Sequence, residues 1–88
     1  MGFLSAMDRD PRNGAVSLAG SGRIVGRQIN SARLERNLTR RDLGDMLGVS
    51  SEQVERYETG EESVPAGKLY RISELFGLPV TDFFKQPD

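Results

Sequence analysis

The side chains best suited to chemistry in this sequence are charged, and they fall into two blocks. Residues 23–41 hold six arginines against one glutamate, a net charge of +5, and residues 42–62 hold seven acids against one arginine, a net charge of −6. The formal net charge of the whole chain of 88 residues is only −1, which is poor for a protein that binds a polyanion. A fold can place the two blocks on different faces, so the distribution still allows a local basic patch that binds phosphate groups.

The sequence lacks two of the residue types on which enzyme catalysis most often depends. The sequence contains no cysteine and no histidine, which removes disulfides, thiol chemistry, the usual zinc ligands and most general-base catalysis. No nucleophile–base pair is recognisable. We therefore expect no catalytic residue, no metal site and no cofactor in a protein that is not an enzyme. The absence of a secretory signal and of a long apolar run predicts one small cytoplasmic domain that does not associate with membranes.

The elements that must position the charges centre on residues 39–60, TRRDLGDMLGVSSEQVERYETG. Thr39 and Asp42 have the spacing of a capping box at the start of a helix, and Gly48 is suited to end that helix. The apolar residues between them recur at the spacing of one helix face: Leu43, Met46 and Leu47. This pattern predicts a short helix that ends in a tight glycine turn.

A second short helix is expected directly after this turn. Ser50 and Gln53 again have the spacing of a capping box. Val54 and Tyr57 then form an apolar face, and Gly60 ends the segment. Helix, glycine turn and helix together are the shape of a helix-turn-helix unit that reads DNA. The alternative is an ordinary helical hairpin that packs a core and reads nothing.

A first helix is expected over residues 23–37, ahead of this pair. Val25, Ile29 and Ala32 lie on one face of that helix. Arg33 falls beside the apolar face, where a long cation should be paired.

Two more helices are expected toward the C-terminus. Pro65 suits the first turn of a helix that ends at Gly77. Thr81 can cap a last short helix that carries Phe83 and Phe84, which are most simply core residues.

Residues 1–22 show no sustained apolar period and are loosened by glycines, which predicts a flexible N-terminal tail. The alternative is an arm that wraps DNA or a partner. The tail reading is favoured because Asp8 and Asp10 cancel the charges of Arg9 and Arg12.

Two stretches of the sequence carry a resemblance to a known family: VGRQINSARLERNLTRRDLGDMLGVSSEQVERYETG and VPAGKLYRISELFGLPVTDFF. Over about residues 23–85 the chain resembles the phage repressor and Cro-type (Xre-like) helix-turn-helix family. The resemblance rests on the combined register of several positions: Arg33, Leu38, Thr39, Leu43, Leu47, Gly48, Val49, Ser50, Tyr57, Glu58 and Gly60.

The resemblance implies an all-α fold, a five-helix lambda-repressor-like DNA-binding domain over residues 23–88 that follows the tail. It also implies sequence-specific binding to a double-stranded DNA operator, usually as a homodimer. The expected function is transcriptional regulation, here by repression.

Roles for individual residues follow from the same resemblance. The arginine that matches Arg33 commonly pairs with the glutamate that matches Glu58, which makes both residues structural. The helix over residues 51–59 would read bases through the side chains left outside: Ser51, Glu52, Gln53, Glu55 and Arg56. Of these, Arg56 can bond guanine and Glu52 can accept from cytosine. Phosphate contacts are expected from three arginines of the basic block: Arg27, Arg40 and Arg41.

The chain departs from the family pattern in ways that bear on function. The family often has glutamine where this chain has Arg40 and Glu52, and Glu52 with Glu55 brings negative charge close to DNA. Gly44 replaces the usual alanine, which costs up to about 1 kcal/mol of helix stability. The acidic helix keeps open a second hypothesis, a protein-interaction module such as the antitoxin of a toxin–antitoxin pair or a regulator of another protein.

The last segment is the expected site of dimer formation. It concentrates Leu78, Val80, Phe83 and Phe84 within seven residues, more apolar surface than a small core is expected to hide. Phe83 and Phe84 are therefore predicted at a two-fold interface, with burial in the core as the alternative.

Overall fold

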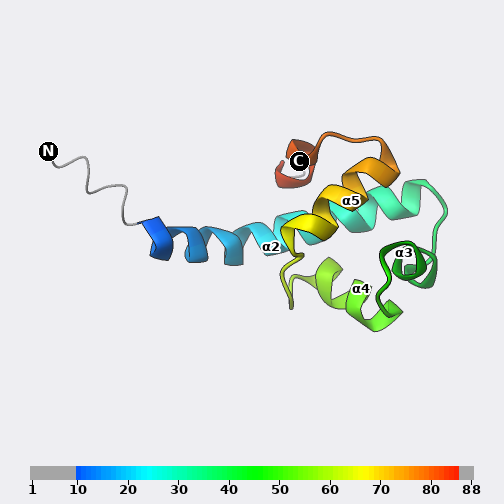
Figure 1. Ribbon diagram of the computed structural model, residues 1–88, viewed down its shortest axis with the longest axis horizontal. Helices are drawn as coiled ribbons and strands as arrows, with labels where there is room; N and C mark the ends of the chain where they lie inside the picture. Colours follow the sequence, from blue (N-terminus) through cyan, green and yellow to red (C-terminus); the bar gives the residue numbers. More distant parts are fainter. Residues whose placement is uncertain (1–9, 86–88) are drawn as a thin grey trace, which may run out of the picture.

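The chain folds into helices alone over the part described by a computed structural model, which gives the backbone of residues 10–85 and the side chains of residues 22–85. Four α-helices and one 3-10 helix follow one another in this part: α2 (Asp10–Glu35), α3 (Arg40–Leu47), α4 (Ser51–Thr59), α5 (Ala66–Phe76) and η1 (Val80–Phe84). The all-α prediction is confirmed (Figure 1). No helix within residues 10–85 is both long and apolar enough to cross a membrane.

The start of α2 differs from the expected start of the first helix at residue 23. The helix begins at Asp10, so residues 10–22, which were predicted to form a tail, have the backbone of α2. Pro11 explains how this is possible, because the missing N–H of a proline costs nothing in the first turn of a helix. The part of the predicted tail over residues 1–9 lies outside the described residues. At its other end α2 stops at Glu35, and Asn37 takes a left-handed backbone with φ of 56°.

The capping box predicted for α3 is complete, whereas the one predicted for α4 is formed only in its Ser50 half. The Asp42 N–H donates to Thr39 Oγ1 at 3.0 Å, and the Thr39 N–H donates to the Asp42 carboxylate at 2.9 Å. Hydrogen bonding of the Asp42 carboxylate by the Thr39 backbone, and next by the Thr39 side chain, lowers the pKa of Asp42. At the start of α4 the Gln53 N–H donates to Ser50 Oγ at 3.1 Å. Gly48 and Gly60 end the two helices with φ of 74° and 83°, a left-handed conformation that favours glycine.

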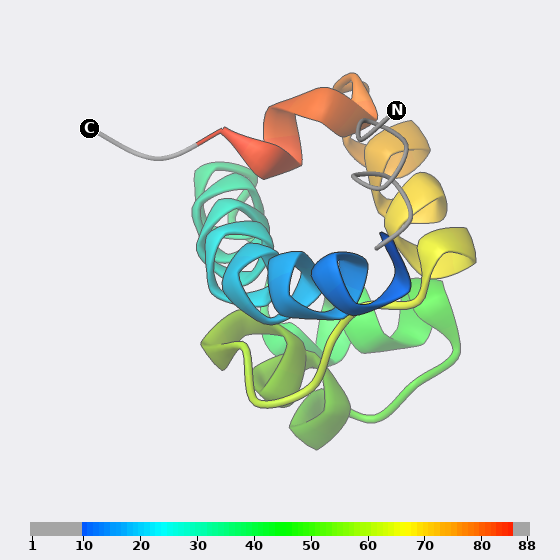
Figure 2. The same cartoon turned by 90° about the vertical axis from the view of Figure 1, so that its left-hand side faces the viewer.

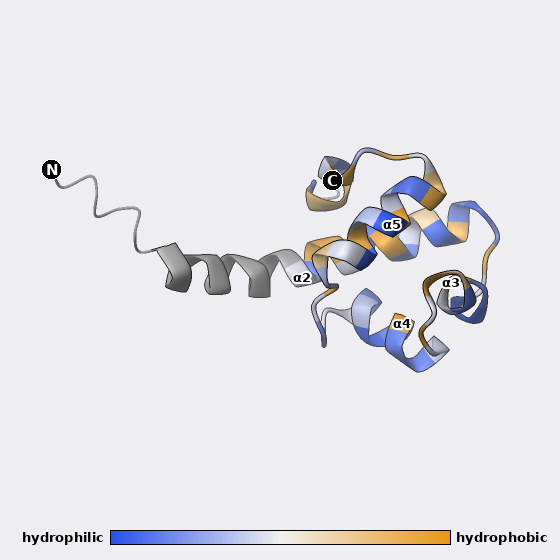
Figure 3. Ribbon diagram, in the orientation of Figure 1, coloured by the Kyte–Doolittle hydropathy of each residue, from blue (hydrophilic) through white to orange (hydrophobic). Residues whose placement is uncertain are grey.

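The core lies among α2, the helix-turn-helix pair, α5 and η1. Figure 2 shows these elements arranged around a common centre, and Figure 3 shows orange apolar segments on the inner sides of α2, α5 and η1. Ten buried apolar side chains form one cluster: Val25, Ile29, Ala32, Leu43, Leu47, Val54, Leu69, Ile72, Phe76 and Phe83. Leu38 packs against this cluster from the connection between α2 and α3.

The fifth helical element is a 3-10 helix and not the α-helix that was expected. Its N-cap is Pro79, so Thr81 lies within the element and does not cap it. The Asp82 N–H donates to the Pro79 carbonyl at 2.9 Å, an i to i+3 bond. A segment of five residues is too short for a settled α-helix and is typical of 3-10 geometry.

Two glycines permit close approach between backbone segments. A Cβ at Gly44 would lie 2.6 Å from the Val49 carbonyl oxygen, so the turn between α3 and α4 is tighter than an alanine allows. A Cβ at Gly26 would lie 2.4 Å from the carbonyl oxygens of both Tyr57 and Glu58. Gly44 is therefore a requirement of this turn and not only a loss of helix stability.

Candidate nucleic-acid interface

Helix α4 has an inner face of buried side chains and an outer face of polar side chains that are exposed or half-buried. Val54, Tyr57 and Glu58 are buried against the rest of the domain. Val54 and Tyr57 are hydrophobic residues of the kind usually found in a core, whereas Glu58 carries a charge that needs hydrogen-bond partners when it is buried. The inner face therefore fixes how α4 rotates about its axis and which side chains it presents outward.

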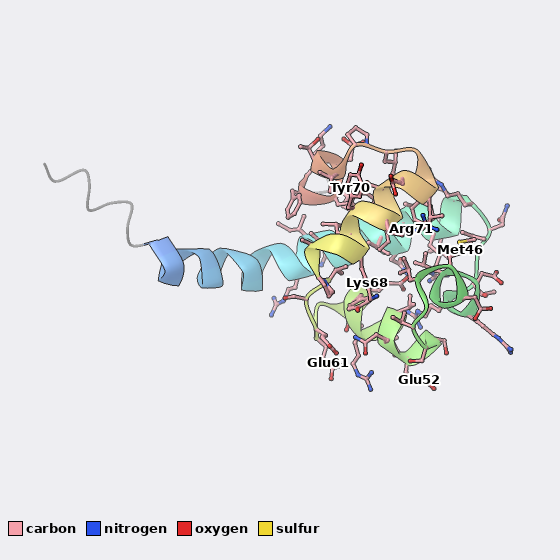
Figure 4. All side chains as sticks on the ribbon, in the orientation of Figure 1. Met46, Glu52, Glu61, Lys68, Tyr70 and Arg71 are labelled. Atoms are coloured by element: carbon pink, nitrogen blue, oxygen red, sulfur yellow. The ribbon has the colours of Figure 1, made fainter. Side chains whose placement is uncertain are left out.

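The outer face carries the polar side chains that were predicted to read bases. Glu52 and Glu55 are exposed, whereas Ser51, Gln53 and Arg56 are half-buried. Figure 4 shows Glu52 at one end of α4, directed away from the body of the domain. Arg56 Nη1 lies 3.5 Å from Gln53 Oε1, a long contact that leaves the guanidinium available to another acceptor. Acceptors and a guanidinium on one helix face are the groups that hydrogen-bond base edges in a major groove.

The buried carboxylate of Glu58 is bonded to α2 through two side chains. Arg33 Nε donates to Glu58 Oε2 at 2.6 Å, and Arg33 Nη2 donates to Oε1 at 3.2 Å. The side chains of Arg33 and Glu58 are 8% and 2% exposed. Asn30 Nδ2 also donates to Glu58 Oε1, at 3.0 Å. The structure thus brings together the two residues that the family resemblance pairs, and it adds Asn30, which sequence reasoning missed.

Asn30 had a recognisable signal in the sequence. It precedes Arg33 by three residues, a spacing that places the two side chains on the same side of a helix. Once Arg33 is assigned to a buried acid, an amide at this spacing is a candidate second donor.

The pKa of Glu58 reflects a balance of two effects. Burial would by itself raise the pKa of this carboxyl group, because a desolvated carboxylate is costly. The hydrogen bonds from Arg33, Asn30 and Arg40, together with the charge of Arg33, outweigh that cost and hold the pKa of Glu58 below its ordinary value. Glu58 is therefore ionised at neutral pH.

The arginines predicted to contact phosphate lie in different surroundings. Arg27 is exposed on α2, and Arg41 is exposed in the first turn of α3. Arg40, the first residue of α3, donates from Nε to Glu58 Oε1 at 2.9 Å while 41% of its side chain stays exposed. The bond between Arg40 and Glu58 was not expected from the sequence.

Arg36, another arginine of the basic block, has a structural role. Its Nη1 donates to the Ala32 carbonyl and its Nη2 donates to the Phe76 carbonyl, both at 2.8 Å. The guanidinium also stacks on the Phe76 ring at 4.6 Å from the centroid. Arg36 thus fastens the end of α5 to the end of α2.

Phe83 and Phe84, both predicted at a dimer interface, are separated by the structure. Phe83 is 1% exposed and belongs to the core, so its assignment to an interface has to be withdrawn. Phe84 is 47% exposed. The reason is that η1 packs against α2 and α5 on one side only, which turns one of two adjacent phenylalanines inward and the other outward.

Metal chemistry finds no support in the described part of the chain. Among these residues no group of three or more histidine, cysteine, aspartate or glutamate side chains is placed to hold a metal ion.

Comparison with known proteins agrees with the geometry of α3 and α4. The sequence model of a family described as helix-turn-helix matches residues 29–83. The chain is 38% identical over 65 residues to an uncharacterized HTH-type transcriptional regulator of Sinorhizobium fredii, which covers 73% of this chain and 46% of that protein.

Two further relatives show the same partial coverage. One is an uncharacterized HTH-type transcriptional regulator of Sinorhizobium medicae, 34% identical over 61 residues, with 69% of this chain and 44% of that protein covered. The other is an uncharacterized transcriptional regulator in the ATPase CF(0) region of Rhodospirillum rubrum, 32% identical over 60 residues, with 68% and 56% covered. The chain spans about half the length of these relatives.

Proposed function

Because this chain belongs to the helix-turn-helix family, we propose that it is a sequence-specific DNA-binding transcriptional regulator that acts as a repressor. The observation that carries the proposal is the outer face of α4, whose side chains are polar while its inner face is fixed by burial. The DNA-binding unit proposed here runs from about residue 23 through η1. The names of the matched relatives describe transcriptional regulators, and none of them favours the antitoxin alternative.

Base reading is assigned to α4 in the major groove of an operator. Arg56 is proposed to donate to guanine O6 and N7, and Glu52 to accept from the N4 amino group of cytosine. The remaining polar residues of the outer face, Ser51, Gln53 and Glu55, are proposed to contact neighbouring bases or the edge of the groove.

Affinity is assigned to the arginines that precede α4. Arg27, Arg40 and Arg41 are proposed to contact phosphates, two of them in the first turn of α3, where the N-terminal end of a helix attracts anions. These cations also offset the repulsion that Glu52 and Glu55 experience near DNA.

The experiment that tests this proposal begins with selection of bound duplexes from a random DNA pool. The selected duplex and a scrambled duplex are then titrated with wild-type protein and with Arg56→Ala. Loss of a base contact should cost about 1–3 kcal/mol on the selected duplex and relax the preference at one base position, with little change on the scrambled duplex. Full discrimination by Arg56→Ala would contradict the assigned reading face, and failure to select any sequence would contradict the proposed function.

The regulator is further proposed to bind as a homodimer, because one α4 contacts only a few base pairs. Two copies related by a two-fold axis would read half-sites about one helical turn apart, roughly 34 Å. Phe84 and Val80 of η1 and Tyr70 of α5 are exposed apolar side chains on two elements that pack together. This surface is the proposed interface.

A charged side chain at Phe84 tests the interface. Phe84→Lys should shift the protein toward monomer in equilibrium sedimentation and weaken binding to a two-half-site duplex, while circular dichroism keeps the helical signal. Leu34→Lys is the matched control, since Leu34 is also exposed but lies on α2. A wild-type protein that stays monomeric at tens of micromolar and occupies single half-sites would rule out the dimer.

A further inference from the structure

The three proposed phosphate-contacting arginines are not equivalent, because among the contacts within residues 22–85 only Arg40 is bonded to a buried acid. Its Nε lies 2.9 Å from Glu58 Oε1, and Glu58 is 2% exposed whereas Arg40 is 41% exposed. We propose that Glu58 is a positioning residue for DNA binding, which holds the guanidinium of Arg40 ready for a backbone phosphate. The inference rests on the proposed function and assigns to Glu58 a role beyond its ion pair with Arg33.

Arg40 is not needed to neutralise Glu58. Arg33 already forms two bonds to the carboxylate and is buried with it, and Arg33 Nη1 donates to the Leu38 carbonyl at 2.7 Å. One carboxylate with two guanidinium groups leaves one positive charge in excess. That excess charge is on the exposed partner, where an ion pair adds little to folding stability.

The guanidinium group suits this arrangement because it has two usable edges. The bond from Nε to Glu58 leaves the Nη1 and Nη2 groups of Arg40, for which the structure shows no acceptor within residues 22–85. Two parallel N–H groups match the oxygens of a phosphate. An ammonium group cannot bond the carboxylate through one fixed edge and a phosphate through another, so lysine does not replace arginine at such a position.

The position of Arg40 along the chain supports the same role. Arg40 is the first residue of α3, directly after the capping residue Thr39, where the free N–H groups of the helix favour an anion. Glu58 lies on α4, so the bond also ties the phosphate-contacting end of α3 to the helix proposed to read bases.

The test compares Arg40→Lys with Arg41→Lys, two substitutions that keep the charge at neighbouring exposed positions. Both variants and the wild type are titrated with the selected duplex over a range of salt concentrations. Arg40→Lys should weaken binding by on the order of tenfold, because the preoriented fork is lost. The slope of log K against log salt should stay unchanged, because the number of charges is kept. Arg41→Lys should weaken binding less than Arg40→Lys does, because no fixed geometry is lost at that phosphate contact.

A third variant, Arg40→Gln, measures the phosphate contact itself. Removal of the charge should reduce the magnitude of the salt slope by about 1. If Arg40→Lys binds like the wild type, or loses no more affinity than Arg41→Lys, positioning by Glu58 is wrong. An unchanged salt slope in Arg40→Gln would show that Arg40 does not contact phosphate at all.

A readout without DNA separates this inference from the proposed function. In ¹H–¹⁵N spectra of the free protein, the Arg40 Nε–H resonance should be sharp and slow to exchange, unlike that of Arg41. The matched Glu58→Gln variant should shift this resonance while the protein stays folded. If the wild type binds no selected duplex, the proposed function is wrong, and so is the proposed role of Glu58 and Arg40 in DNA binding. If the duplex binds but Arg40 and Arg41 give equally broadened resonances, the positioning by Glu58 alone is overturned.

Discussion

Glutamate residues on the two faces of α4 have different surroundings and different roles. Glu58 on the inner face is 2% exposed and accepts hydrogen bonds from Asn30, Arg33 and Arg40. Glu52 and Glu55 on the outer face are exposed, and the structure assigns neither of them an ion pair within residues 22–85. A carboxylate on the inner face contributes to folding, whereas the carboxylates on the outer face remain free for a partner.

The acidic block of residues 42–62 is therefore not one functional unit. Its net charge of −6 counts Glu58 together with the exposed acids. Glu58 is already compensated by Arg33, so the negative charge that DNA would meet comes from other positions, above all from Glu52 and Glu55 on the proposed reading face.

Removal of the inner carboxylate should have the largest effect on stability. Glu58→Ala leaves Arg33 buried without a partner, and breaking a buried ion pair in this way costs about 3–5 kcal/mol. The melting temperature should fall sharply in calorimetry or circular dichroism. Glu55→Ala on the outer face is the control, and it should stay within about 0.5 kcal/mol of the wild type. Equal melting temperatures for the two variants would contradict the claim that Glu58 contributes more to folding stability than Glu55 does.

A methyl group added at Gly26 should have the next largest effect, because it meets the backbone behind the inner face. The new Cβ would lie 2.4 Å from the carbonyl oxygens of Tyr57 and Glu58, so α2 and α4 must move apart. We expect Gly26→Ala to lower the free energy of unfolding by about 1–3 kcal/mol, as overpacked sites do.

Gly67→Ala in α5 is the matched control for this substitution. Nothing lies within 4 Å of a Cβ at Gly67, so alanine should raise the free energy of unfolding there, by up to about 1 kcal/mol. Denaturant titration of both variants decides the point. A neutral Gly26→Ala would mean that α2 and α4 approach each other less closely than described.

Protonation of Glu58 should have a smaller effect than its removal, because the neutral carboxyl group still fills the site. A carboxyl whose pKa is lowered by folding stabilises the folded state while it is ionised. For Glu58 this contribution is fully present above the pKa of the unfolded chain and is lost as the pH falls through the lowered pKa of the folded protein. Stability should therefore fall on the acid side of the ordinary glutamate range.

The measurement is denaturant unfolding of wild type, Glu58→Gln and Glu55→Gln from neutral to acid pH. Glu58→Gln should show a shallower decline than the wild type, and Glu55→Gln should follow the wild type. The pKa of Asp42 is also lowered, but Asp42 is present in all three proteins and cancels in the comparison. Parallel curves for Glu58→Gln and the wild type would show that Glu58 gains nothing from ionisation.

The sequence predicts α3 and α4 well because their limits depend on neighbouring residues. Thr39 with Asp42, Ser50 as an N-cap, and the glycines that follow are local signals that the structure shows in place, and only the return bond from the Gln53 side chain is missing. The start of α2 is less well predicted from the sequence. Pro11 and the glycines after it read as a loosened segment, but a helix can include glycines, and a proline in its first turn is no obstacle.

Tertiary contacts account for the features that could not be predicted. The bond from Arg40 to Glu58 requires α3 and α4 to meet at a particular angle, and no spacing in the sequence encodes that angle. Phe83 and Phe84 are chemically identical neighbours, and only the packing of η1 on α2 and α5 decides which one is buried. The pairing of Arg33 with Glu58 was available in advance only because the family resemblance supplied it.

The placement of η1 has a practical consequence for building larger proteins from this domain. Figures 1 and 2 show η1 on the side of α2 that faces away from α4. Gln28 Nε2 donates to the Lys85 carbonyl at 2.6 Å, which fastens the end of η1 to α2. A fluorescent protein or an activation domain joined after Lys85 would therefore start on the far side of the domain from α4. A fusion at this point leaves α4 unobstructed but adjoins Phe84 of the proposed dimer interface, so its linker has to be long enough to clear that surface.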